Sequence, residues 1–247
     1  MKKTLNILFP VYNEERRLEH GIRETHSYLL KEDIRYILTI VDNASTDQTE
    51  EIAQSLCKEI SEHVRYIRIQ EKGVGAAFRA GIAANQCDIV GYMDVDLSTD
   101  IRHIPQMYKI FQADDAVDMV NASRWNKKSD TSGRKFYRNI TSIGLVCLLK
   151  LVFGMRASDA ICGFKFFRKE TAVALVIEAG NSTKGWFYLI ELLLRAERNG
   201  LKVEELPVRW VDDSKNSTVQ TFTLIREYLA QIVSLRHRMR QEDKNAV

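Results

Sequence analysis

YILTIVDNASTDQTEEIAQSLCKEI, residues 36 to 60, is an apolar run that passes through a polar turn into an amphipathic segment. The run 36–41 is rich in Ile, Val and Leu, which is typical of a buried strand, and 46–60 places apolar residues at helical spacing. The same unit recurs around it, with apolar runs at 5–9, 64–69 and 89–93 and helical patterns at 14–30 and 75–84. Strands that alternate with helices in this way predict an α/β fold with a doubly wound, mostly parallel sheet.

The second half of the chain is less regular. It contains further apolar runs at 119–122, 162–167 and 203–210 and helical patterns at 134–153, 186–199 and 221–240. No linker rich in Pro, Gly or Ser and no internal repeat divides the chain. We therefore expect a single domain over residues 1–213, followed by an amphipathic, basic helical extension over 214–247. One stripe of that extension is apolar and consists of Ile225, Leu229, Ile232 and Val233.

Composition indicates where the protein acts. Of its 247 residues 45% are hydrophobic and 28% charged, as in ordinary globular proteins, and the formal net charge is +3. Asn6 and Pro10 interrupt the first apolar run, unlike a signal peptide. The longest apolar stretch, 140–153, contains Lys150 and is shorter than the roughly 20 residues that span a bilayer. The four cysteines form no C-x-x-C pair, which fits a reducing compartment. We expect a cytoplasmic protein without a nucleic-acid partner, and the oligomeric state stays open.

Polar residues follow each of the first four predicted strands. Because the carboxyl ends of parallel strands share one edge of a sheet, these residues should lie together where ligands bind in such folds. Turn and capping roles explain one or two such loops, but four favour a shared site. The residues are Asn13 and Glu14 after the first strand, Asp42 and Asn43 after the second, 71–73 after the third and 94–96 after the fourth.

The segment MDVDLSTD, residues 93 to 100, places two carboxylates one residue apart at the end of an apolar run. In an extended chain residues i and i+2 point the same way, so Asp94 and Asp96 can face one cation. Mg²⁺ and Mn²⁺ favour carboxylate oxygens, and Mg²⁺ is commonly bound by one or two carboxylates together with substrate phosphates. The pair therefore predicts a Mg²⁺ or Mn²⁺ site that neutralises a diphosphate leaving group.

Two further loops suit a nucleotide. Asp42 comes just before the residues that can cap the next helix, so its carboxylate is available to a nucleobase N–H or a ribose hydroxyl. Lys72 begins the glycine turn KGVGAA, which opens a helix where backbone N–H groups can meet phosphate. The turn is not G-x-G-x-x-G, and the sequence has neither a P-loop nor H-E-x-x-H. A dinucleotide-binding domain, a P-loop NTPase and a zinc hydrolase are therefore unsupported.

Taken together, these segments resemble glycosyltransferase family 2, whose members have the GT-A fold of nucleotide-diphospho-sugar transferases. Within the family, the set is most similar to the polyprenyl- and dolichyl-phosphate glucosyl- and mannosyltransferases. The second-strand motif usually reads Asp-Asp in the family, whereas this chain has Asp42-Asn43. The resemblance covers about residues 4 to 213 and is carried by PVYNEE (10–15), VDNASTDQT (41–49), KGVGAAFRAG (72–81), MDVDLSTD (93–100), ASRW (122–125), DAICGFKFFRKE (159–170) and IELLLRAERNGLKVEELPVRW (190–210).

The resemblance implies roles for individual residues. It assigns the donor nucleotide to Pro10, Tyr12, Glu14 and Asp42, to which the glycine turn adds Lys72. It assigns the metal and the diphosphate to Asp94 and Asp96, with Asp96 also catalytic, and the acceptor side to Arg124.

The same resemblance implies an inverting, metal-dependent enzyme that moves a hexose by single displacement from a nucleotide-diphosphate sugar. UDP-glucose is the favoured donor, GDP-mannose is possible, and the acceptor is a polyprenyl phosphate at the cytoplasmic membrane face. A lipid monophosphate is already largely ionised near neutral pH, so positioning and charge neutralisation matter more than a base. Asp159, just before the turn at Gly163, is a candidate catalytic base or positioning carboxylate, or else a turn residue.

Arg134, Lys135 and Arg138 directly precede the apolar run 140–153. Basic residues beside an apolar amphipathic segment suit an element that lies at the level of lipid headgroups. We therefore expect peripheral membrane binding, with Arg134 and Arg138, like Arg124, as ligands of the acceptor phosphate. A core-packing helix with a solvated basic face is the alternative.

Three other functions stay open. The same transferase could act on a hydroxyl of a soluble glycan or glycolipid. A nucleotidyltransferase could share the fold, but it would usually carry a basic glycine-rich loop where this chain has PVYN at 10–13. A non-catalytic nucleotide-sugar-binding or interaction module is the third alternative.

Overall fold

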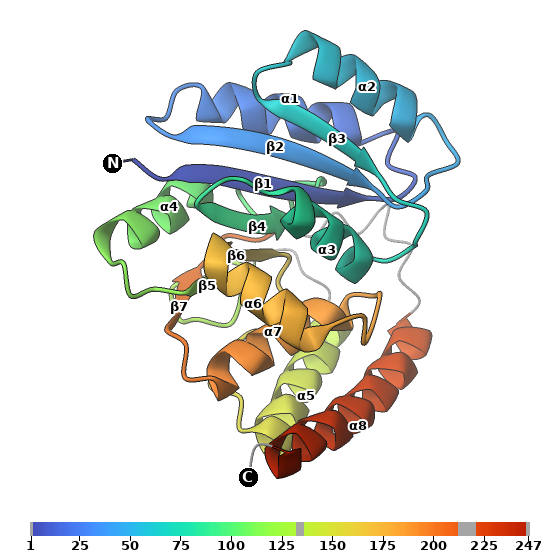
Figure 1. Ribbon diagram of the computed structural model, residues 1–247, viewed down its shortest axis with the longest axis vertical. Helices are drawn as coiled ribbons and strands as arrows, with labels where there is room; N and C mark the ends of the chain where they lie inside the picture. The colour runs from blue at the N-terminus through green and yellow to red at the C-terminus, as the bar shows by residue number, and fades with distance from the viewer. Residues whose placement is uncertain (1, 132–135, 212–220, 246–247) are drawn as a thin grey trace.

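The computed structural model describes the backbone of residues 2–131, 136–211 and 221–245 and the side chains of 2–131, 139–211 and 226–245. In this part of the chain seven strands form one sheet in the order β3-β2-β1-β4-β6-β5-β7 (Figure 1). Of the seven, β6 is antiparallel to both of its neighbours and the other adjacent pairs are parallel. The predicted doubly wound, mostly parallel sheet is confirmed. The strands are β1 (Thr4–Val11), β2 (Arg35–Asp42), β3 (Val64–Arg68), β4 (Ile89–Met93), β5 (Met119–Ser123), β6 (Phe164–Arg168) and β7 (Val203–Pro207).

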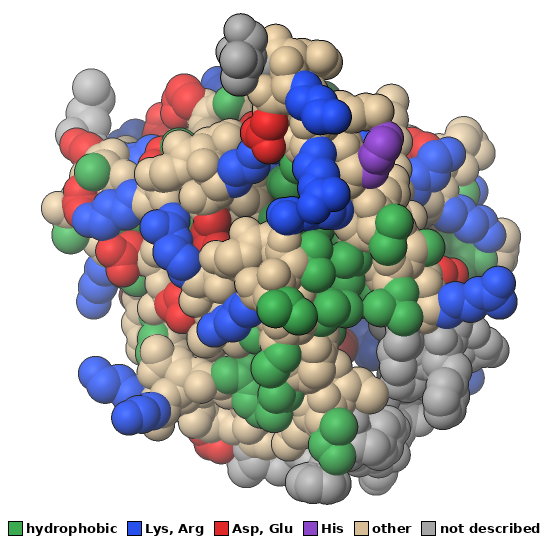
Figure 2. Space-filling model, turned by 90° about the horizontal axis from the view of Figure 1, so that it is seen from below, with side chains coloured by type: hydrophobic (Ala, Val, Ile, Leu, Met, Phe, Trp, Pro, Cys, Tyr) green, Lys and Arg blue, Asp and Glu red, His purple; other side chains and the backbone are tan. Residues whose placement is uncertain are grey.

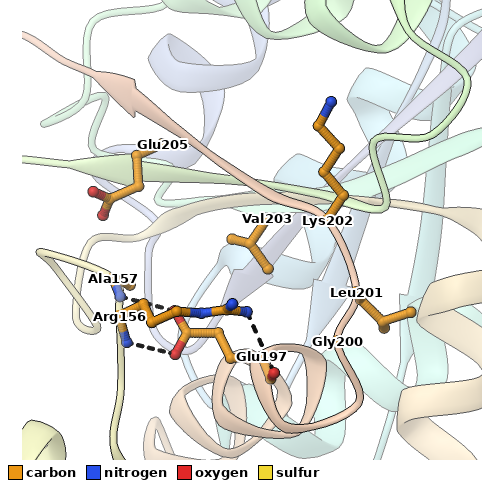
Figure 3. Close-up of a pocket in the computed structure, with 8 residues that line it drawn as sticks. All are labelled: Arg156, Ala157, Glu197, Gly200, Leu201, Lys202, Val203 and Glu205. Carbon is orange, nitrogen blue, oxygen red and sulfur yellow. Dashed lines mark hydrogen bonds between the residues drawn. The ribbon is translucent and has the colours of Figure 1, made fainter.

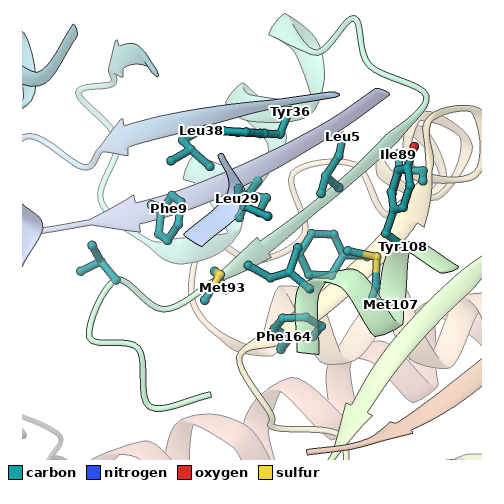
Figure 4. Close-up of a cluster of buried hydrophobic side chains, with 14 of the residues drawn as sticks. Leu5, Phe9, Leu29, Tyr36, Leu38, Ile89, Met93, Met107, Tyr108 and Phe164 are labelled. Carbon is teal, nitrogen blue, oxygen red and sulfur yellow. The ribbon is translucent and has the colours of Figure 1, made fainter. Parts of the chain in front are cut away.

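Strand β1 shows why both faces of the sheet need a covering layer. Leu5, Ile7 and Phe9 belong to one buried cluster, whereas Leu8 belongs to a second cluster on the opposite face. All four side chains are fully buried, as expected when alternate residues of a strand point to opposite faces of a two-sided core. Figure 4 shows the first cluster, in which side chains of β1, β2 and β4 meet those of α1 and α4.

Helices cover both faces of the sheet (Figure 1). The first cluster is completed by α1 (Leu18–Leu29), α2 (Thr49–Glu59) and α4 (His103–Ala113). The second is completed by α3 (Val74–Ala84), α5 (Phe136–Phe153), α6 (Lys169–Ala179), α7 (Phe187–Arg198) and α8 (Thr221–Asn245).

Helices α4 and α6 were missing from the predicted elements. The sequence of α4 does carry the pattern, because Ile104, Met107, Tyr108 and Phe111 are spaced at i, i+3, i+4 and i+7 and all are buried.

Helix α8 divides its predicted apolar stripe between the core and the surface. Ile232 is buried, with Leu235 and Met239, whereas Leu229 and Val233 are exposed; the side chain of Ile225 lies outside the described residues. Arg238 of α8 also donates through both terminal nitrogens to the carboxylate of Glu191 on α7, at 2.8 and 2.9 Å. Glu191 is fully buried. One side of α8 therefore packs on the domain, and the side with Leu229 and Val233 is exposed to solvent. None of the helices in the described ranges is long and apolar enough to cross a bilayer.

Candidate active site

The loops that follow β1, β2 and β4 meet at one edge of the sheet, as predicted. Each contains a residue in the left-handed conformation that side chains normally avoid: Asn13 (φ 55°), Ala44 (φ 58°) and Leu97 (φ 56°). Such residues cost of order 1 kcal/mol each and concentrate at functional sites, where the surrounding structure holds them. The three residues with strained backbone therefore lie in the loops that the sequence predicts to form the ligand site.

Two half-buried carboxylates follow β4. Asp96 accepts the Ser98 N–H on Oδ1 at 2.9 Å, and its Oδ2 lies 3.9 Å from Nη1 of Arg17. Burial, with the charge of Asp96, raises the pKa of Asp94 to about 8. Gly163 packs directly against Asp94, because a Cβ at this position would lie 2.0 Å from Asp94 Oδ2. A neighbouring cation would hold both carboxylates in their ionised form.

The acidic pair offers two carboxylates to a cation. Across the described part of the chain, no group of three or more His, Cys, Asp or Glu residues is arranged to hold a metal ion. Two carboxylates with oxygen donors fit a hard divalent cation that takes its remaining ligands from substrate phosphates and water.

Arg17 was not predicted as part of this site. Its guanidinium donates Nε and Nη2 to the two oxygens of Glu14, at 2.7 and 2.6 Å, and faces Asp96. Burial raises the pKa of Glu14 despite this partner. Glu14, assigned to the nucleoside by resemblance, is thus linked to the acidic pair through Arg17, while its backbone N–H donates to Thr49 at the start of α2 at 2.8 Å. The i, i+3 spacing of Glu14 and Arg17 was the signal in the sequence.

Asp42 lies at the end of β2 and is fully buried. Its oxygens accept the Ser45 N–H at 2.9 Å and the Tyr66 hydroxyl at 2.8 Å. The neighbouring Asn43 accepts the Gly73 N–H on Oδ1 at 3.1 Å and donates to the Val11 carbonyl at 3.1 Å. Asp42 and Asn43 thus fix the shape of the loops expected around the nucleoside.

Tyr12 and Lys72 come together beside these loops. Lys72 Nζ lies 4.5 Å from the centre of the Tyr12 ring and donates to its hydroxyl at 2.8 Å. Tyr12 is 43% exposed, so its ring is accessible to a planar ligand. Pro10 lies on β1, paired with Val41 of β2.

The glycine turn does not present its helix N-terminus to a phosphate. The N–H groups of Gly75 and Ala76 donate to the carbonyl of Lys184, at 2.8 and 3.3 Å. Gly73 has φ 129°, and a Cβ there would lie 2.1 Å from the same carbonyl oxygen. The expectation that these N–H groups meet phosphate is wrong, because the segment before α7 already occupies the position.

Arg124 and Asp159 form a buried ion pair. Arg124 donates Nε and Nη2 to the carboxylate at 2.7 and 3.1 Å, and its backbone N–H adds a third bond at 3.1 Å. Burial alone would raise the pKa of Asp159, but the Arg124 guanidinium outweighs it and lowers the pKa to about 2. A carboxylate held in this way is a poor proton acceptor, so of the three roles open to Asp159 the geometry disfavours that of a base. It fits a positioning carboxylate that is also a turn residue, because Oδ1 accepts the N–H groups of Ile161 and Cys162. The guanidinium also lies 5.5 Å from the ring centre of Trp210.

The remaining acceptor candidates are not placed. Arg134 lies outside the described residues, as does the side chain of Arg138, whose backbone belongs to α5.

A cavity of about 490 Å³ lies elsewhere, between the end of α7, β7 and the segment before β6 (Figure 3). None of the predicted site residues lines it. Glu197 accepts the backbone N–H groups of Arg156 and Ala157, at 2.7 and 2.8 Å, and Glu205 accepts that of Ser158 at 2.7 Å. These carboxylates hold the chain around the cavity.

Sequence comparisons place these residues in a known group. The sequence model of Glycosyl transferase family 2 matches residues 6–173. Dolichyl-phosphate beta-glucosyltransferase ALG5A of Trichomonas vaginalis is 30% identical over 225 residues, which cover 85% of this chain and 67% of that protein. The human dolichyl-phosphate beta-glucosyltransferase is 28% identical over 222 residues, covering 85% and 68%. Glycosyltransferase AglD of Haloferax volcanii is 30% identical over 210 residues, so that 83% of this chain spans only 33% of AglD.

Solved structures share the architecture. Glucosyl-3-phosphoglycerate synthase from Mycobacterium tuberculosis in complex with UDP has a TM-score of 0.70 at 20% identity, covering 95% of this chain and 80% of that one. Its complex with Mn²⁺ and UDP-glucose has a TM-score of 0.69 at 19% identity, covering 95% and 79%. The predicted GT-A fold is confirmed, and with most of its length matched by the family model the chain belongs to glycosyltransferase family 2.

Proposed function

We propose that this chain is an inverting transferase that moves a hexose from a nucleotide-diphosphate sugar to a polyprenyl phosphate at the cytoplasmic face of a membrane. Glucose from UDP-glucose is the favoured donor and GDP-mannose the alternative. The observation that carries the proposal is the juxtaposition of the acidic pair, Asp94 and Asp96, with the ion pair of Arg124 and Asp159 across Gly163. The dolichyl-phosphate glucosyltransferases among its relatives support the choice of acceptor.

Asp94 and Asp96 would hold Mg²⁺ or Mn²⁺. When bound, the cation supplies positive charge against the diphosphate as it leaves. A phosphate oxygen of the acceptor forms the new bond to the anomeric carbon, and the bond from that carbon to the diphosphate oxygen breaks on the opposite face. Because the acceptor phosphate is already ionised, the reaction needs no strong base, which suits an Asp159 that is committed to Arg124.

Helices α5 and α8 form the end of the molecule proposed to face the membrane. Figure 2, which views the molecule from below, shows hydrophobic side chains gathered on this face with Lys and Arg side chains around them. An apolar surface with a basic margin suits an anionic lipid surface. The exposed apolar residues of the two helices include Ile140, Ile143, Leu151, Leu229 and Val233, and their exposed basic residues include Lys150, Arg226, Arg236 and Arg240.

The double substitution Ile143→Ser and Leu151→Ser should weaken membrane binding about tenfold or more, since each apolar side chain contributes roughly 1 kcal/mol or more when it enters the lipid interface. Both are exposed, at 46% and 85%, so folding should be little affected. The measurement is co-sedimentation with vesicles containing anionic lipid. Leu30→Ser is the matched control, because Leu30 is 60% exposed at the end of α1, far from α5 in Figure 1. Equal loss with the control substitution would argue against this face.

Asp42→Ala should weaken binding of the donor nucleotide about tenfold, with a smaller change in kcat. The substitution removes the acceptor for the Ser45 N–H and the Tyr66 hydroxyl, and the nucleoside loop loses its shape in ground and transition states alike. Calorimetry with UDP measures the effect. Asp88→Ala is the control, because Asp88 accepts a backbone N–H and a hydroxyl in the same way, from Thr4, at the opposite edge of the sheet. Unchanged UDP affinity would remove Asp42 from the donor site.

The proposal is tested by incubating the purified protein with Mn²⁺ and individual nucleotide sugars, with and without polyprenyl phosphate in vesicles. The expected result is release of nucleoside diphosphate, strongest from UDP-glucose and dependent on the lipid, with a glycosylated lipid as product. Transfer to a glycan or glycolipid hydroxyl instead would favour the soluble-acceptor alternative. Nucleotide-sugar binding without turnover would favour a non-catalytic module.

A further inference from the structure

The turn from Asp159 to Gly163 contacts both halves of the proposed site. At its start, the Asp159 carboxylate holds the Arg124 guanidinium, and its Oδ1 also accepts the N–H groups of Ile161 and Cys162 at 2.9 and 3.2 Å. At its end, Gly163 packs against the carboxylate of Asp94 with no room for a side chain. Any shift of this turn would therefore change the position of Arg124 relative to Asp94.

Two buried side chains hold the turn from beneath. Lys165 on β6 donates from Nζ to the carbonyl of Cys162 at 3.1 Å and to Oδ1 of Asn121 at 2.7 Å. Asn121 on β5 donates from Nδ2 to the carbonyl of Asp159 at 2.7 Å. Lys165 and Asn121 face each other as partners in the β5–β6 register, and both are fully buried. The two ends of the turn are thus tied to adjacent strands by one continuous set of hydrogen bonds.

Burying a lysine at this position costs free energy. A fully buried ammonium loses its hydration, and the partners found for this one are a carbonyl and an amide, both neutral. Burial accordingly lowers the pKa of Lys165. What Lys165 supplies is geometric, because its Nζ reaches an oxygen of the turn and an oxygen of the neighbouring strand at the same time. The carboxylates of Asp159 and Asp94 both lie within its electrostatic reach.

We propose that Lys165 and Asn121 are positioning residues, which set the separation between the acceptor-binding Arg124 and the acidic pair by fixing the turn from Asp159 to Gly163. This inference rests on the proposed function, because it takes Arg124, which the family resemblance assigns to the acceptor side, as a ligand of the acceptor phosphate. Neither residue touches substrate. Their effect is confined to the step in which an anionic acceptor must be aligned with the anomeric carbon, since a misplacement of about 1 Å costs roughly 100-fold in rate. Attack by water on the same donor does not require an anionic acceptor to be held by Arg124.

The experiment compares two reactions of the same purified protein: transfer from UDP-glucose to polyprenyl phosphate in vesicles, and hydrolysis of UDP-glucose by water without acceptor. Lys165→Met should lower transfer about 100-fold, while hydrolysis and UDP affinity stay within a few-fold of wild type. Asn121→Asp is a second variant in which Lys165 keeps an acceptor and gains an opposite charge as its partner, while the donor to the Asp159 carbonyl is replaced by an oxygen. It should shift the ratio of transfer to hydrolysis in the same direction.

Arg168→Met is the matched control. Arg168 lies on the same strand and donates to the carbonyls of Val117 and Asp114, at 2.6 and 2.7 Å, at the opposite end of the sheet. This substitution should lower the melting temperature without changing the ratio. If Lys165→Met and Asn121→Asp lower transfer and hydrolysis in parallel, as Arg168→Met would, the two residues are merely structural and the proposal is overturned.

If the proposed function itself is wrong, the experiment gives a different result. Wild-type protein would then hydrolyse UDP-glucose or use another acceptor without using polyprenyl phosphate. The ratio measured with the acceptor that is used would still decide the role of Lys165, because an unchanged ratio in both variants contradicts positioning for any acceptor.

Discussion

Asp96→Asn should lower transfer roughly 1000-fold, because a ligand of the divalent cation is worth several kcal/mol of charge stabilisation in the transition state. The fold should survive. Asp96 accepts the Ser98 N–H on Oδ1, and the asparagine carbonyl can keep this bond while the amide nitrogen replaces Oδ2 as a non-ligand. The measurements are the initial rate with UDP-glucose and polyprenyl phosphate, the melting temperature, and the affinity for Mn²⁺ by electron paramagnetic resonance.

Wild-type protein in excess EDTA should show the same loss of rate as Asp96→Asn. The control variant is Asp100→Asn, four residues further along, whose carboxylate accepts from the backbone N–H and guanidinium of Arg102 outside the acidic pair. It should keep its rate and Mn²⁺ affinity. Normal turnover by Asp96→Asn, or by wild type without metal, would contradict the proposed chemistry.

Asp159→Ala should lower the free energy of unfolding by about 3–5 kcal/mol, since it leaves the buried Arg124 guanidinium without its carboxylate. It should also reduce transfer, because the guanidinium is no longer held in place. Equilibrium unfolding in urea near neutral pH measures the first effect. Asp114→Ala is the comparison, because its ion pair with Lys202 is exposed at the surface and exposed pairs contribute little.

The same ion pair predicts a pH dependence of stability. The pKa of Asp159 falls from an ordinary value of 3.8 to about 2 in the folded protein, so the unfolded chain binds the proton more readily. Its contribution, about 2 kcal/mol by linkage, is fully present above pH 4 and is lost as the pH falls from about 4 to about 2. Asp159→Asn should flatten the stability curve over this interval. An unchanged slope would mean that the pair does not titrate with folding.

The local patterns were enough to predict the fold. A strand or helix in a two-sided sheet reveals itself by the spacing of its apolar residues, which is why β1 to β4 and the helices between them were recognised. The direction of β6 was not predictable in this way, because apolar runs look alike in either direction. Helix α4 was overlooked although its spacing was readable, and α6 has a less polar outer side, with Val173 and Ile177 exposed.

In the candidate site, too, local features were predictable from the sequence and long-range contacts were not. Asp94 and Asp96 could be chosen from the sequence, because their spacing and their place at the end of a strand are local facts. Three sets of contacts were not visible in the sequence. They are the bonds that the glycine turn donates to the Lys184 carbonyl, the ion pair of Arg124 with Asp159, 35 residues away, and the bonds of Lys165 and Asn121 to the turn from Asp159 to Gly163. Apart from the local bond of Lys165 to Cys162, these contacts join segments that lie far apart in the chain and meet only in the folded sheet, where β6 lies between β4 and β5. The sequence by itself determined which strands and which carboxylates this protein has, because both follow from neighbouring residues. Tertiary structure alone decided which charges face one another, because burial removes the water that would otherwise screen them and leaves each buried charge dependent on the partner that packing supplies.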